Sequence, residues 1–234
     1  MRDPEPAERT PARREDLEKL AVSWNLGLGN YVCRENQIVA RMGKLDWYWP
    51  FPSYRWSATP AAAAERPIDI SFRGRLRYHR DTVSYQRVET ARLLSEFENE
   101  SGCATAPRNK LPYREYRHEM RRSKVVLSPF GFGEINVGRD LECFIDGALL
   151  VKPDMSHMET WPDLFVPGVT YVPYRWDFAD LKDVLRRALA HRPDALRIAA
   201  AGQARYVAAL GSEGGEAFAD HLAALLRRAM AASR

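Results

Sequence analysis

Beyond residue 66, the apolar positions of the chain change their period from one segment to the next. Four runs of four or five mostly apolar, β-branched or aromatic residues are typical of buried strands, and they occupy 68–72, 124–128, 148–151 and 169–173. Helical period and helix-terminal residues predict helices over 84–99, from Pro112 to about 120, over 138–146, after Asp177 as N-cap, from Pro193 to Gly211, and on to about 231. Strands that alternate with helices predict an α/β fold with a three-layer, Rossmann-like parallel sheet.

Two of these helices have a predicted apolar face. In the helix over 84–99, apolar residues recur every three positions at Tyr85, Val88, Ala91 and Leu94. After Asp177 the corresponding face consists of Phe178, Leu181, Leu185 and Ala188. Because ligands of such sheets bind at the carboxyl ends of the strands, the loops that follow the strands are the candidate site.

Residues 1–66 have no clear helix or strand period. They contain Trp24, Trp47, Trp49 and Trp56, too many large aromatic residues for a free linker. We therefore expect an aromatic-rich N-terminal extension, followed by a domain over 67–234. The extension would cover that domain, form a ligand platform, or dock a partner subunit or a second copy of the chain, and the sequence leaves these three roles open.

Composition narrows the class of protein and of ligand. Of the 234 residues, 45% are hydrophobic and 28% are charged, which excludes a disordered chain. The 35 Lys and Arg residues exceed the 31 Asp and Glu residues only slightly, giving a net charge of +4. This mild excess argues against a nucleic-acid partner and favours a small anionic ligand.

Targeting segments and metal motifs are not recognisable in the sequence. No apolar run reaches the roughly 18 residues of a membrane span, and eleven of the first twenty residues are charged, unlike a signal peptide. We therefore expect a soluble, cytoplasmic protein. Three isolated cysteines and five scattered histidines give no disulfide framework and no metal-ligand spacing.

The turn after the first strand is a candidate phosphate site. Gly74 allows close backbone approach to a ligand, and Arg73 and Arg75 on either side of it are suited to gripping a pyrophosphate. A solvated basic loop is the alternative. The glycines do not form the GxGxxG pattern, which argues against a nicotinamide or flavin dinucleotide.

The most informative segment runs from residue 123 to residue 151. A buried strand leads into a turn with Gly131 and Gly133 and then into a helix, whose first free N–H groups suit an anion. On that helix Arg139 and Glu142 share a face, the arginine suited to phosphate and the carboxylate to ribose hydroxyls. An ordinary intrahelical ion pair explains the same spacing.

This segment resembles the nucleotide-binding domain of GT-B glycosyltransferases, in particular the group 1 transferases. Their motif, R-x-x-E followed by four residues, G, three residues and V, is present as Arg139, Glu142, Gly147 and Val151. The resemblance implies that Glu142 binds the ribose of a sugar nucleotide. It covers about residues 67–210 and places Arg75 at the diphosphate and Tyr113 in the loop against the base.

The resemblance also suggests residues near the reacting sugar. Glu134 precedes Glu142 by eight positions, as in the E-x7-E pattern of retaining members, whose first glutamate lies near the donor sugar. The loop after the third strand contains His157, which could act on a hydroxyl or bind phosphate. A histidine satisfied by the loop backbone is the alternative, and the stereochemistry of transfer is left open.

The implied function is transfer of a sugar from a nucleotide-diphosphate sugar to an unidentified acceptor, a glycan, lipid or small molecule. The donor is a substrate, so no cofactor is expected, and no DxD motif or other metal site is recognisable. GT-B enzymes have two such domains, whereas one is visible here. The alternative is a non-catalytic nucleotide-sugar-binding or partner-docking domain, or a truncated enzyme.

Overall fold

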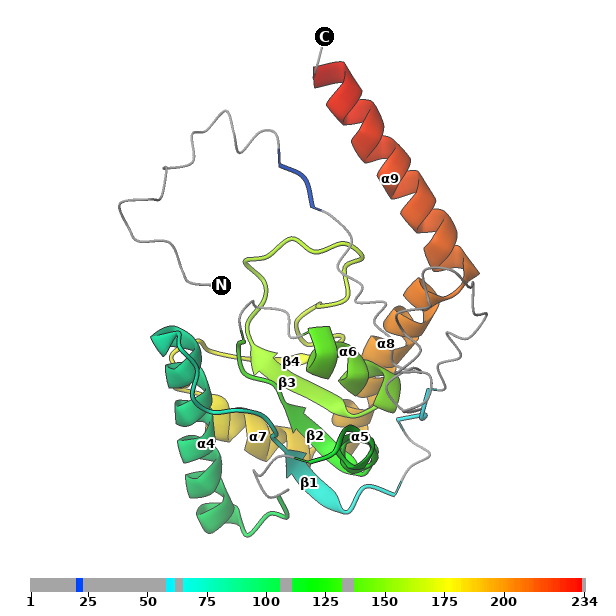
Figure 1. Cartoon of the computed structure of the whole chain (residues 1–234). Helices are drawn as coiled ribbons and strands as arrows, with labels where there is room; N and C mark the ends of the chain where they lie inside the picture. Colours follow the sequence, from blue (N-terminus) through cyan, green and yellow to red (C-terminus); the bar gives the residue numbers. More distant parts are fainter. Residues whose placement is uncertain (1–19, 23–57, 62–64, 106–110, 132–136, 233–234) are drawn as a thin grey trace, which may run out of the picture.

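The structure is a computed structural model that describes residues 20–22, 58–61, 65–105, 111–131 and 137–232 (Figure 1). Its centre is a sheet of four parallel strands in the order β1 (Ile68–Ser71), β2 (Ser123–Leu127), β3 (Leu149–Pro153) and β4 (Val172–Tyr174). Ile70 lies opposite Val125, and Val126 lies opposite Leu150. Because the strands are parallel, all four carboxyl ends meet at one edge of the sheet.

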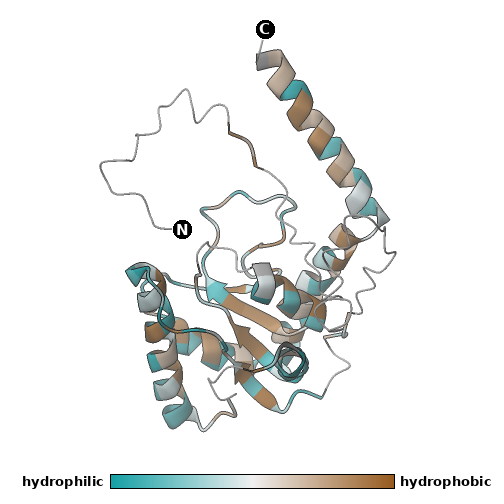
Figure 2. Ribbon diagram, viewed as in Figure 1, coloured by the Kyte–Doolittle hydropathy of each residue, from teal (hydrophilic) through white to brown (hydrophobic). Residues whose placement is uncertain are grey.

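Helices cover both faces of this sheet. They are α4 (Asp81–Ser101), α5 (Tyr113–Arg121), α6 (Val137–Asp146), α7 (Leu181–Ala190), α8 (Arg192–Leu210) and α9 (Ser212–Ala232). Val125 and Leu127 pack in the apolar cluster beneath α4 and α7, while Val126 packs in the cluster beneath α5 and α6. This alternation, visible as apolar strands between helices in Figure 2, confirms the predicted three-layer α/β fold.

Residues 58–61 and 65–66 pack at the amino end of the sheet. The Thr59 amide donates to the carbonyl of Ile145 at 3.0 Å, and Gln203 donates to the carbonyl of Thr59 at 2.7 Å. Arg66 donates to the carbonyls of Ser123 and Asp146 at 2.9 and 2.8 Å. The packed unit therefore begins before residue 67. Trp24, Trp47, Trp49 and Trp56 lie outside the described residues.

The predicted face of α4 is partly wrong. Tyr85 and Val88 are 61% and 41% exposed, although Ala91 and Leu94 are buried as expected. A spacing of three residues drifts about 60° per step around a helix with 3.6 residues per turn. The buried side of the helix instead consists of Val83, Arg87, Thr90, Ala91, Leu94 and Phe97.

Two boundaries near β4 also differ from expectation. The strand begins at Val172 rather than at 169, because Gly168, with φ 70°, forms a turn in which its amide donates to the Tyr171 carbonyl. Asp177 is not the N-cap of α7, which begins at Leu181. Phe178 has a φ of 62° that no helix accommodates, so the expected helix start is displaced by one turn.

Among the described helices, none is long and apolar enough to cross a membrane. The longest, α4 and α9, have 21 residues each. Figure 1 shows that α9 runs away from the sheet beyond the end of α8.

Candidate functional site

Two arginines converge on the turn after β1. Gly74, with φ 142°, lies in this turn, and a Cβ built there would be 2.7 Å from Nη2 of Arg139 and 2.7 Å from Nη1 of Arg87. Arg87 donates to the carbonyl of Arg75 at 3.3 Å, and Arg139 donates to the carbonyl of Arg73. Glycine suits this turn because L side chains rarely adopt a φ of 142°, and an added Cβ would also displace the ends of the two guanidinium groups.

These two guanidinium groups are buried and carry like charge. Arg87 is 4% exposed and Arg139 is 9% exposed. Burial lowers the pKa of Arg87, and the neighbouring charge of Arg139 lowers it further. Among the described residues, Nε of Arg87 and both Nε and Nη1 of Arg139 have no hydrogen-bond partner. Buried charged donors are normally paired, so this point of the fold fits an anionic group.

Aromatic rings hold the two arginines in place. The guanidinium carbon of Arg87 lies 5.1 Å from the ring centroid of Tyr78, and that of Arg139 lies 5.7 Å from the ring centroid of Phe72. Contacts of this kind favour a cation over the ring face. Arg87 comes from α4 and Arg139 from α6, so the site joins two helices on opposite faces of the sheet to the end of β1.

The side chain of Arg73, a predicted phosphate ligand, is engaged elsewhere. Arg73 is buried, and its guanidinium forms an ion pair with Glu119 of α5, with Nε 2.9 Å from Oε1. The hydroxyl of Ser71 donates to the same carboxylate at 2.7 Å. The contribution of Arg73 to the site is thus its backbone carbonyl, which receives Arg139. Arg75 is exposed beside this turn, where its side chain can reach a ligand.

A buried network fixes the start of α6 against the strand ends. The carboxylate of Asp140 accepts hydrogen bonds from the hydroxyl of Ser128 at 2.5 Å and from the ammonium of Lys152 at 2.6 Å. Ser128 directly follows β2, and Lys152 belongs to β3. Arg139 precedes Asp140, so the network sets the position of its guanidinium. Lys152 is 1% exposed, and its ammonium forms a buried ion pair with Asp140.

Glu142 is placed one turn further along α6 and is 2% exposed. Burial raises the pKa of the Tyr116 hydroxyl; the Arg139 guanidinium opposes that rise and the Glu142 carboxylate adds to it. Both residues of the predicted Arg139 and Glu142 pair therefore lie near the same tyrosine of α5. The structure brings Arg139 to Gly74 at the end of β1 and places Glu142 three positions further along the same helix.

The other predicted residues are placed as follows. Gly131 is buried at the end of the described loop after β2, whereas Gly133 and Glu134 lie outside the described residues. Tyr113 is the first residue of α5, and its side chain is not among those described. His157 is exposed, with its ring 5.6 Å from that of Trp176. In the described ranges, no group of three His, Cys, Asp or Glu side chains could hold a metal ion.

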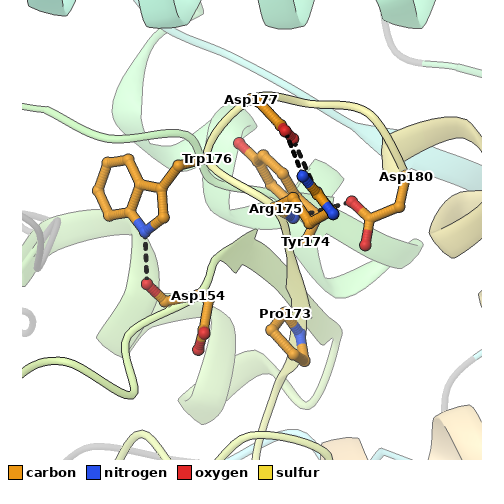
Figure 3. A pocket seen from close by; sticks show the side chains of 7 residues that line it. All are labelled: Asp154, Pro173, Tyr174, Arg175, Trp176, Asp177 and Asp180. Atoms are coloured by element: carbon orange, nitrogen blue, oxygen red, sulfur yellow. Dashed lines mark hydrogen bonds and ion pairs between the residues drawn. The ribbon is translucent and has the colours of Figure 1, made fainter.

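Two hollows lie at the carboxyl ends of the strands, and Trp176 lines both. The first has a volume of about 460 Å³ and is shown in Figure 3, where the indole N–H of Trp176 donates to the Asp154 carbonyl and Arg175 pairs with Asp177. The second has a volume of about 400 Å³ and lies against the start of α4. Its lining residues are Asp81, Thr82, Tyr85, Gln86, Phe130 and Trp176.

A family model described as glycosyl transferase-like matches residues 61–212, more than half of the chain. The chain belongs to this glycosyl transferase-like family. No curated protein matches it. Among solved structures, it is similar to the pneumococcal O-GlcNAc transferase GtfA in complex with UDP and GlcNAc, at 15% sequence identity and a TM-score of 0.36. The likeness covers 82% of this chain and 44% of that one, so the chain spans less than half the length of GtfA.

Membership of the glycosyl transferase-like family confirms the resemblance inferred from the R-x-x-E motif. Sequence reasoning missed Arg87, the second arginine at Gly74. A helical period of 3.6 residues could have found it, because Arg87 falls on one side of α4 with Val83, Ala91 and Leu94. A charged residue on the apolar side of a helix is itself a signal of a buried polar site.

Proposed function

We propose that this chain is the donor-binding half of a GT-B glycosyltransferase that takes a sugar from a nucleotide-diphosphate sugar. The observation that carries the proposal is the pair of buried guanidinium groups of Arg87 and Arg139, which converge on Gly74 with unpartnered N–H groups. A diphosphate has the charge and the acceptor oxygens that such a pair lacks. Membership of a glycosyl transferase-like family supports the same reading.

The remaining parts of the donor follow the motif. Glu142 accepts hydrogen bonds from the ribose hydroxyls, and Tyr113 is the candidate residue for the base. Arg75 and the backbone of Gly131 and Gly133 complete the diphosphate site. Glu134 and His157 are the candidates for groups near the reacting sugar.

In the transfer step, the bond between the anomeric carbon and the diphosphate oxygen breaks. A bond forms between that carbon and an acceptor hydroxyl oxygen, whose proton passes to a base. The electron pair of the broken bond remains on the departing diphosphate. Arg87 and Arg139 stabilise the negative charge that develops there, which is the contribution a divalent cation makes in metal-dependent transfer.

Isothermal titration calorimetry of the full chain with UDP, GDP, dTDP and CDP, and with sugars of each, tests the proposal. The variants Arg87→Met and Arg139→Met remove a guanidinium while keeping much of the side-chain volume. Arg92→Met is the matched control, because Arg92 lies on the same helix with its side chain 52% exposed. We expect one nucleotide class to bind, with about tenfold or greater weakening in the first two variants only.

Two results decide against the proposal or refine it. A folded wild-type chain that binds none of these ligands contradicts it, as does equal weakening in Arg92→Met. Mass spectrometry of the mixture with candidate acceptors then separates an enzyme from a binding domain. Affinity without released nucleotide diphosphate or glycosylated product would identify a non-catalytic domain that works with a partner.

A further inference from the structure

Helix α9 presents an apolar face that is exposed. Leu222, Leu226 and Met230 recur every four positions and are 42%, 57% and 66% exposed. Positions four apart lie on one side of a helix, so these three side chains form an α9 stripe about 12 Å long. The helix begins against α8, where Gly214 approaches the backbone of Ala209, and then runs away from the sheet (Figure 1). An exposed apolar stripe on a projecting helix is typical of a docking surface.

Contacts on another side of α9 hold the helix in place. The ring of His221 stacks on that of Trp161, with centroids 3.9 Å apart and planes 5° from parallel. Nε2 of the same histidine lies 3.0 Å from the carbonyl oxygen of Val22. Because His221 directly precedes Leu222, its side chain lies about 100° away from the stripe around the helix. The helix is therefore fixed while its stripe is exposed, and a surface that is already ordered loses little conformational entropy when it binds.

The charges of α9 are divided along its length. The first half contains Glu213, Glu216 and Asp220, and the second half contains Arg227 and Arg228. Glu216 and Arg227 are exposed and flank the same edge of the stripe, but they lie about 16 Å apart along the axis, too far to pair within one helix. Two α9 helices side by side and antiparallel would bring the acidic half of each opposite the basic half of the other, whereas a parallel pair would bring like charges together.

One antiparallel register satisfies both the apolar and the charged pattern. A two-fold axis at Leu222 would pack this residue against its own copy and would bring Phe218 opposite Leu226 of the second copy. The same axis would place Glu216 within one residue of the level of Arg227 of the second copy. By symmetry this ion pair would occur twice, once on each side of the axis.

We propose that α9 pairs with α9 of a second copy of this chain in this antiparallel register, which makes the chain a homodimer. The pairing buries both apolar stripes and sets opposite charges face to face. One helix from each copy gives a contact smaller than the standard interface of about 1,600 Å², so we expect a dissociation constant in the micromolar range. The inference goes beyond the proposed function, and its test needs no nucleotide.

Sedimentation velocity of the full chain, over about a hundredfold range of concentration around the micromolar range, tests the pairing. We expect the mass to rise from 26.7 kDa toward twice that value. Leu222→Glu should raise the dissociation constant at least about tenfold, because it places a charge at the two-fold axis. Ala224→Glu is the matched control, since Ala224 is exposed on the opposite side of α9, and circular dichroism verifies that both variants keep their helix content. A wild type that is monomeric throughout overturns the proposal and leaves the stripe to another occupant, such as residues 23–57 of the same chain. Equal association of Leu222→Glu and wild type also overturns it, because the interface then lies elsewhere.

A charge exchange tests the antiparallel register. Glu216→Arg and Arg227→Glu should each weaken association by about threefold or more at low salt, because each sets like charges opposite one another. The double variant exchanges the two charges and should associate as wild type does. In a parallel pair each residue would face its own copy, so neither single variant would weaken association. Single variants that associate like wild type, or a double variant that does not recover, contradict the proposed register.

Discussion

Arg87 and Arg139 come from different helices, and each brings one guanidinium nitrogen to 2.7 Å from the point where a Cβ of Gly74 would lie. Like charges this close repel, and burial removes the water that would screen them. The fold nevertheless holds both groups there through aromatic contacts and backbone carbonyls. An anion bound between the two guanidinium groups would offset the repulsion between their charges and accept hydrogen bonds from their N–H groups.

Replacement of Arg87 is therefore expected to affect stability and binding in opposite directions. Burial and Arg139 lower the pKa of Arg87, so the folded state disfavours its charged form. Arg87→Met should raise the free energy of unfolding of the ligand-free chain by about 1 kcal/mol, since a poorly paired buried charge is removed. Thermal unfolding without ligand and calorimetry with nucleotide measure the two effects. A less stable variant with unchanged affinity would contradict this prediction.

Gly74→Ala should weaken nucleotide binding, because the added Cβ would displace the ends of both guanidinium groups. Gly102→Ala is the matched control, because Gly102 also has a positive φ, 66°, but nothing lies within 4 Å of the added Cβ. Both variants should lose about 1 kcal/mol of stability from backbone strain. Nucleotide affinity, measured by calorimetry on the folded fraction, should fall only for Gly74→Ala. A similar loss of nucleotide affinity in both variants would show that backbone strain alone causes it.

The ion pair between Glu119 and Arg73 is expected to hold the Arg73 backbone carbonyl where it accepts the hydrogen bond from Arg139. Glu119→Gln should cost about 3 kcal/mol of stability, because a buried charge loses its partner, and should also weaken nucleotide binding by displacing the carbonyl that receives Arg139. Asp146→Asn breaks the buried contact with Arg117, 2.7 Å long, at the amino end of the sheet. Denaturant unfolding should show a cost for both variants. Calorimetry should show weaker nucleotide binding for Glu119→Gln only.

Glu142→Ala should weaken nucleotide-sugar binding by about 1 to 3 kcal/mol, because a charged hydrogen bond to the ribose is lost. The specific readout is the comparison between a ribonucleotide and its 2′-deoxy analogue. Wild type should prefer the ribonucleotide, and the variant should bind both alike. Glu115→Ala, at an exposed position of α5, is the control. Undiminished discrimination in Glu142→Ala would remove the ribose role.

The fold was predictable because each strand and helix has a local signal. Pro112 and Gly211 marked the limits of α5 and α8, and both flank the helices as expected. The missed boundaries were those where local signals competed. Asp177 is a good N-cap residue, yet its side chain pairs with Arg175 and accepts from the Ala179 amide within a turn. A cap and a turn use the same carboxylate, so the sequence alone could not separate them.

The candidate site could be predicted from the sequence only where the motif names its residues. Arg139 and Glu142 belong to a recognisable motif. Arg87 belongs to no motif, and only its place on the buried side of α4 identifies it. Arg73 looked as suitable for phosphate as Arg75, because nothing local indicates that Glu119, 46 positions away, takes its guanidinium. Partnerships between distant residues depend on the packed structure and are not visible in residue spacing.

The most direct test of the central claim is whether the Arg87 and Arg139 pair recognises a diphosphate. Calorimetry on wild type and Arg139→Met would compare a nucleoside diphosphate with the corresponding nucleoside. We predict that wild type prefers the diphosphate by at least about a hundredfold and that this preference largely disappears in the variant. An equal preference in both proteins would contradict the claim, because the diphosphate would then be held elsewhere.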